Sequence, residues 1–115
     1  VESQAIQMFK KAVRFKKSEP IYCLLLCRMI GEAYLNKKFF DECNSWPSKT
    51  LTMGDLKDKK LGFDGVLTRE ESIGLTHLGK STNPFLHYKT DDEILSPQSL
   101  ERVLDFIKQI WGLEQ

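Results

Sequence analysis

The apolar segment at residues 21–35 constrains the fold of this chain more than any other part of its sequence. Arg28 and Glu32 interrupt it, so the run is too short and too polar to span a membrane. As a helix it would be apolar nearly all round, which is typical of the central helix of a small domain. We therefore expect a buried helix at about residues 20–35, with Pro20 near its first position and Arg28 paired with Glu32. Its apolar side chains are Tyr22, Leu24, Leu25, Leu26, Met29, Ile30, Ala33 and Tyr34.

Amphipathic segments near both ends of the chain provide faces that can pack against this central helix. Near the C-terminus, Ser96 is a favourable N-cap, Pro97 suits the first helical position and Gly112 is placed to end the helix. Residues 2–17 show the same kind of periodicity. The apolar arc of the last segment is Leu100, Val103, Leu104, Phe106, Ile107, Ile110 and Trp111, and that of the first is Ala5, Ile6, Met8, Phe9, Ala12, Val13 and Phe15.

The middle of the chain is less regular, and shorter helices are expected there. Thr68 and Glu71 form a capping box at the start of one of them, and Gly79 is placed to end it. The expected ranges are 37–44, 52–61 and 69–78.

Pro84 disfavours the helical conformation of Asn83, so residues 81–88 are expected as loop or extended chain. The sequence as a whole predicts a mainly α, compact, single domain over residues 1–115. It would contain five or six helices, with room for a small two-stranded ribbon near Gly65–Leu67.

One chemical motif occurs at residues 74–81, where GLTHLGKS matches the phosphate-loop pattern G-x-x-x-x-G-K-[ST]. That pattern binds phosphate where a buried strand leads into a glycine-rich loop and a helix starts at the Gly-Lys pair. Residues 68–73 carry two adjacent glutamates and a helix-start signature instead, and Pro84 follows where the phosphate-binding helix should form. We interpret the match as a coincidence, and the chain is not expected to be an enzyme.

The cysteines and histidines do not form a recognisable metal or catalytic site. Cys23 and Cys27 share one face of the central helix, but Cys43, His77 and His87 lack the spacing that structural zinc requires. Two cysteines within an apolar run indicate buried reduced thiols.

A partial calcium-loop pattern at residues 60–71 has Lys60 and Gly62 at two positions that need oxygen ligands, so a plain turn before a capped helix is expected. Acidic residues precede the last helix, where its dipole favours negative charge. These residues are Asp91, Asp92 and Glu93. No metal or other cofactor is expected.

The net charge of +1 conceals a segregation of charge along the chain. Residues 1–60 carry 12 Lys/Arg against 7 Asp/Glu, whereas residues 61–115 carry 5 against 9. The outward arc of the first helix gathers Lys10, Lys11, Arg14 and Lys17, with Lys16 at its edge. Such a face suits acidic proteins, phosphate backbones or anionic lipid, and it is equally typical of a solvated surface that balances the acidic half.

We expect a non-catalytic protein–protein interaction module whose binding residues are Lys10, Lys11, Arg14 and Lys17. The expected partner is a protein, and an acidic protein is one of the candidates. The alternative is a helical domain that binds nucleic acid through the same face, although Phe9 and Phe15 belong to the core arc and do not favour single strands. A nucleotide-binding enzyme fragment is a third reading.

The chain begins at Val1 rather than at a methionine, so we expect a fragment of a larger protein. No segment of the given sequence has the pattern of a signal peptide or a transmembrane helix, and its cysteines are expected to be reduced. These features favour an intracellular location, either cytoplasmic or nuclear.

Overall fold

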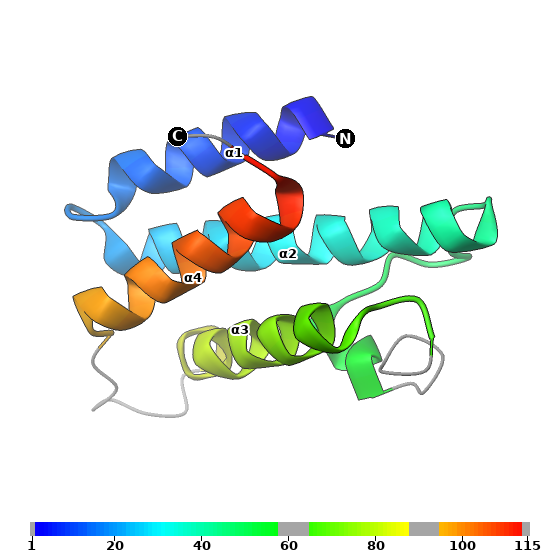
Figure 1. Ribbon diagram of the computed structural model, residues 1–115. Coiled ribbons are helices and arrows are strands. Elements are labelled where there is room, and N and C mark those ends of the chain that lie inside the picture. Colours follow the sequence, from blue (N-terminus) through cyan, green and yellow to red (C-terminus); the bar gives the residue numbers. More distant parts are fainter. Residues whose placement is uncertain (1, 58–64, 88–94, 114–115) are drawn as a thin grey trace.

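The computed structural model describes residues 2–57, 65–87 and 95–113, which form four α-helices and one 3₁₀-helix (Figure 1). These are α1 (Glu2–Phe15), α2 (Pro20–Cys43), η1 (Met53–Lys57), α3 (Arg69–His87) and α4 (Pro97–Trp111). α2 crosses the middle of the molecule, with α1 along one side, α3 along the other and α4 in front of it (Figure 1). α1 and α3 run antiparallel to α2, and α4 runs parallel to it. The mainly α, compact fold is confirmed.

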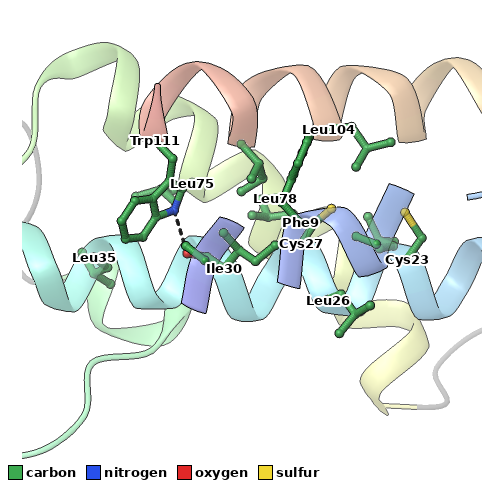
Figure 2. Packing of buried hydrophobic residues seen from close by; sticks show 14 of the residues in the cluster. Phe9, Cys23, Leu26, Cys27, Ile30, Leu35, Leu75, Leu78, Leu104 and Trp111 are labelled. Atoms are coloured by element: carbon green, nitrogen blue, oxygen red, sulfur yellow. Dashed lines mark hydrogen bonds between the residues drawn. The ribbon is translucent and has the colours of Figure 1, made fainter. Parts of the chain in front are cut away.

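The core forms where α2 meets the other three α-helices. Cys23, Leu24, Cys27, Ile30 and Leu35 of α2 are at most 1% exposed. α4 contributes four buried residues on its predicted arc, namely Leu100, Leu104, Ile107 and Trp111. Figure 2 shows the Trp111 indole reaching the α2 backbone, where its Nε1–H donates to the carbonyl oxygen of Ile30 at 3.2 Å. The central position predicted for residues 20–35 is therefore confirmed.

The expected number of five or six helices is wrong for the described residues, mainly because α2 does not end near residue 35. It continues to Cys43 and includes the helix expected at residues 37–44. Asn36 binds the returning chain from inside the helix: its Nδ2 donates to the Leu51 carbonyl at 2.9 Å, and its Oδ1 accepts from the Leu51 N–H at 2.8 Å. The polar residue thus fixes a later segment to α2 and does not break the helix. Asn44, with φ of 58°, ends α2 in the left-handed conformation.

Two shorter elements also differ from expectation. The helix expected at residues 52–61 is limited to the 3₁₀-helix Met53–Lys57 within the described part, and residues 58–61 lie outside it. Gly65–Leu67, the suggested site of a ribbon, form a turn, and the described residues contain no strand. Leu67 is nevertheless buried, at 3% exposed, so the turn packs against the core.

α3 begins as expected and ends later than expected. The capping box is present: the Thr68 N–H donates to Glu71 Oε1 at 2.8 Å, and the Glu71 N–H donates to Thr68 Oγ1 at 3.2 Å. The helix does not close at Gly79 but runs through Pro84 to His87, so the prediction of loop or extended chain is wrong for residues 81–87.

Arg28 explains how α3 continues past a residue that normally disrupts helices. Its Nη1 lies 2.6 Å from Thr82 Oγ1, 2.9 Å from Asn83 Oδ1 and 3.3 Å from the Gly79 carbonyl oxygen. Pro84 has no N–H, so the turn before it loses one backbone hydrogen bond. The Arg28 contacts from α2 hold that turn in helical form and outweigh the local preference of Asn83 for an extended conformation.

Candidate interaction surface

The predicted binding residues lie on the outer side of α1. Lys10, Lys11 and Arg14 are exposed, whereas Phe9 and Ala12 on the opposite side are at most 3% exposed. Helical periodicity causes this separation, because residues three and four apart share a face. Burying the apolar side of α1 against its neighbours therefore presents these cations to solvent together.

Lys17 lies beyond the helix, since α1 ends at Phe15 and residues 16–18 form a turn. It is exposed, but the helical spacing that placed it with Lys10 and Arg14 does not apply there. We use the name basic surface for Lys10, Lys11, Arg14 and Lys17 together. Within the described part of the chain, no carboxylate lies within 4.0 Å of a charged nitrogen of these four residues.

Lys16 behaves differently from its neighbours because it pairs with α4. Its Nζ lies 2.7 Å from Glu101 Oε1, and the hydrogen bond and charge of that carboxylate raise the pKa of Lys16 above its usual value. The pair joins the basic half of the chain to the acidic half. Lys16 is therefore part of the structural contact between α1 and α4 and is not included in the basic surface.

Tyr22 of α2 lies beside the basic surface, although its sequence pattern placed it with the core residues. The side chain is 37% exposed, and Lys11 Nζ lies 5.6 Å from the centroid of its ring. Phe15 packs edge-on against the same ring, with centroids 5.0 Å apart. An exposed aromatic ring next to cations is a common feature of recognition surfaces. The sequence carried no signal for this exposure, because the central helix is apolar nearly all round.

The segment that matches the phosphate-loop pattern is helical throughout, because residues 74–81 lie inside α3. Its backbone N–H groups take part in helical hydrogen bonds and do not surround an anion. Both motif glycines are explained by packing: an added Cβ at Gly74 would overlap the Phe106 ring, and one at Gly79 would lie 3.2 Å from Met53 Cβ. Lys80 is exposed and, with Arg28, lines a cavity of about 510 Å³ between α3 and η1.

Cys23 and Cys27 are buried free thiols, as expected, whereas Cys43 is exposed. Contact with the Cys27 thiol lowers the pKa of Cys23, while contact with Cys23 and burial raise the pKa of Cys27. Among the described residues, no group of three or more His, Cys, Asp or Glu side chains is arranged to hold a metal ion. The two sulfurs pack within the core between α1, α2 and α4 (Figure 2).

The other candidate residues are either separate or outside the described part. His77 is exposed on α3, where its carbonyl oxygen accepts a hydrogen bond from Ser81 Oγ at 2.8 Å. The side chain of His87, the acidic residues Asp91, Asp92 and Glu93, and the calcium-loop positions Lys60 and Gly62 lie outside the described residues. Of these candidates, the structure therefore places only the side chain of His77, which lies on α3 and is not part of the basic surface.

Comparison of the chain with protein-family models, with curated proteins and with solved structures finds no match. None of the helices in the described ranges has both the length and the apolar character needed to cross a membrane.

Proposed function

We propose that this domain is a non-catalytic interaction module of a larger intracellular protein and that it binds an acidic protein partner through the basic surface. The observation that carries the proposal is the group of cations on α1 that lack carboxylate neighbours in the described part of the chain, next to the exposed ring of Tyr22. Lys16 and Lys37, by contrast, are each paired at 2.7 Å. Cations that the fold leaves without such pairs are available to a partner.

Electrostatics determine what such a surface can do. An exposed ion pair contributes little, typically below about 1 kcal/mol, so a partner held by these charges alone would bind weakly and dissociate quickly. Complementary charge instead increases the association rate and selects against basic partners. The affinity should therefore fall steeply as the salt concentration rises.

The test replaces Lys10, Lys11, Arg14 and Lys17 with Gln, which removes the charges and keeps residues that favour helix. A matched control replaces Lys37, Lys49, Arg69 and Arg102 with Gln, which removes four cations from other surfaces. Proteins retained from a cell extract by each variant are quantified by mass spectrometry at low and at high salt. We expect the basic-surface variant to fold normally, by circular dichroism, and to lose an acidic partner that the control variant retains.

Retention of every wild-type partner by the folded basic-surface variant would contradict the proposal and make these charges a solvated outer face. The alternative function is nucleic-acid binding by the same residues, which the exposed Tyr22 ring favours because bases stack on aromatic side chains. This alternative is tested by measuring the binding of a labelled single-stranded RNA by fluorescence anisotropy. Salt-dependent RNA binding that is lost in the basic-surface variant, without loss of a protein partner, would favour the alternative.

A further inference from the structure

α2 exposes a stripe of large apolar side chains on the side opposite the core. Ile21, Tyr22 and Met29 are 44%, 37% and 52% exposed, and Leu25 between them is half-buried. We name these four residues the apolar stripe. Single exposed apolar residues are common on protein surfaces, but several on one helix face mark a site of interaction.

The outward face of α4 shows that this fold can cover its surface with polar residues. Glu101, Arg102, Asp105 and Gln109 are all exposed there, and the buried side of α4 is apolar. α2 lacks that separation, because its core side is apolar and three apolar residues are also exposed at positions 21, 22 and 29. The apolar stripe is thus a departure from the pattern of the same molecule.

The apolar stripe and the basic surface are continuous. Lys11 lies over the Tyr22 ring, and further along the same antiparallel helix pair Gln4 of α1 and Ala33 of α2 line one cavity. Met29 lies two helical turns from Tyr22, between these two points of contact. The basic surface therefore meets the apolar stripe at Tyr22, where Lys11 lies over the ring, and Arg14 follows one turn further along α1.

We propose that the occupant of this combined surface is an acidic amphipathic helix of a partner protein. This inference rests on the proposed function and specifies the kind of segment that is bound. The partner helix would place its apolar side chains on Tyr22, Leu25 and Met29 and its carboxylates against Lys11 and Arg14. The charge complementarity comes from the basic surface, and the apolar contacts supply the affinity that exposed charges alone do not provide.

A helix fits this surface better than an extended peptide does. The described part of the domain offers no strand edge, so an extended segment would find no backbone partners for its N–H and C=O groups. A helix satisfies its own backbone and presents side chains at i, i+3, i+4 and i+7. The separation of Tyr22 and Met29, about 10 Å along the α2 axis at 1.5 Å per residue, matches the distance between partner residues i and i+7.

The test uses three fluorescent peptides of about 20 residues, long enough to form helix on binding. The first has leucines at i, i+3, i+4 and i+7 on one face and glutamates on the flanking positions. The second has the same composition in scrambled order, and the third carries a proline at the centre of the first. By fluorescence anisotropy, we expect the first peptide to bind at least about tenfold more tightly than either of the others.

The apolar contribution is tested with Met29→Gln, which keeps the length of an exposed side chain and a residue that favours helix. The affinity of this variant for the first peptide should be about fivefold lower or more, and its affinity for the scrambled peptide should be unchanged. Ile73→Gln is the matched control, because Ile73 is 49% exposed on the outer side of α3 and should leave both affinities unchanged. The basic-surface variant should bind every acidic peptide more weakly than the wild type does.

Three results would overturn the inference. In the first, the wild type binds all three peptides equally and the basic-surface variant binds none of them. An acidic partner would then be held by charge alone, so the proposed function would stand without the amphipathic helix. Failure of every peptide to bind would exclude the helix, while the cell-extract experiment decides the proposed function independently. Tighter binding of single-stranded RNA, or of phosphatidylserine–phosphatidylcholine vesicles, at equal salt would assign the surface to a different class of ligand.

Discussion

At the scale of single residues, packing rather than chemistry explains the glycines of α3. Gly74 and Gly79 look in the sequence like parts of a phosphate-binding loop, yet each lies where a neighbouring side chain approaches the helix backbone. Phe106 of α4 occupies the space beside Gly74, and Met53 of η1 the space beside Gly79. A motif match records which residues are present, and the surrounding structure decides which property of glycine is used.

Gly74→Ala should therefore destabilise the domain. In an open helical site this substitution would stabilise by about 1 kcal/mol, because alanine favours helix. Here the added Cβ would overlap three atoms of the Phe106 ring, so the ring must move and α3 must shift from α4. We expect a net loss of about 1–3 kcal/mol by urea denaturation. Gly54→Ala is the control, because its nearest atom would be Thr52 Oγ1 at 3.6 Å, and a stabilised Gly74→Ala variant would contradict the close contact.

At the scale of elements, local signals were sufficient where a helix carries them at both ends. Ser96 and Gly112 bound α4 in the structure as predicted, with Ser96 Oγ accepting from the Ser99 N–H at 3.1 Å and Gly112 at φ of 64°. The end of α3 could not be predicted locally, because the helix passes Pro84 with the support of Arg28, more than 50 residues earlier in the chain. α2 likewise continues past residue 35, where Asn36 holds Leu51 of the returning chain from within the helix. Helix caps can be predicted from neighbouring residues in the sequence, whereas tertiary contacts cannot.

The start of α3 should give the domain a pH-dependent stability through Glu71. Burial alone would raise the pKa of Glu71, but hydrogen bonds from the Tyr34 hydroxyl and the Thr68 N–H, with Lys38 nearby, outweigh it and lower this pKa. A lowered pKa means that the unfolded chain binds the proton more readily. The stabilisation is therefore complete above the ordinary glutamate pKa and is lost as pH falls through the lower value in the folded state.

Glu71→Gln tests this contribution, because Gln retains the shape of the capping box without the charge. We expect the variant to be less stable than wild type by about 1 kcal/mol at pH 7, and the difference to diminish toward pH 3 as wild-type Glu71 becomes protonated. The measurement is urea denaturation at pH 7, 5, 4 and 3. Glu70→Gln removes the same charge at an exposed neighbouring position. A difference between wild type and Glu71→Gln that is constant across this pH range would show that the charge of Glu71 is not used.

At the scale of the whole molecule, the segregation of charge is partly resolved within the fold. Lys16 pairs with Glu101 at 2.7 Å, and Lys38 lies 3.9 Å from Glu71, so each pair joins the basic half to the acidic half. The sequence showed which cations share a face of α1, but it did not show which of them the rest of the fold would pair. Nor did it identify the apolar stripe, because a helix apolar nearly all round gives no indication of the side that stays exposed. The sequence thus predicted the charged residues of the candidate surface but did not predict its exposed apolar residues.

The packing of α4 onto α2 should make the domain unfold as one unit, and Ile107 is the residue that tests it. Ile107 is fully buried, and one turn further on Trp111 donates its indole N–H to the Ile30 carbonyl and packs edge-on against Tyr34. Ile107→Ala leaves a cavity between helices far apart in sequence, so we expect a loss of about 2–5 kcal/mol. Ile73→Ala, the same change at a half-exposed position on α3, should cost far less. Both are measured in a Trp46→Phe background, which removes the exposed tryptophan and leaves Trp111 as the fluorescent reporter.

Because α2 contacts all three other α-helices, Trp111 fluorescence and far-ultraviolet circular dichroism should follow the same urea transition in wild type and in Ile107→Ala. The variant's midpoint should shift to lower urea with an unchanged slope, since the same surface is exposed on unfolding. Two separate transitions would mean that α4 detaches before the α1–α2 pair unfolds. A midpoint within error of wild type would mean that Ile107 does not face the core. The pair between Lys16 of the α1–α2 turn and Glu101 of α4 should hold α4 in the same cooperative unit as α1 and the basic surface. Either result would mean that α4 is not part of that unit.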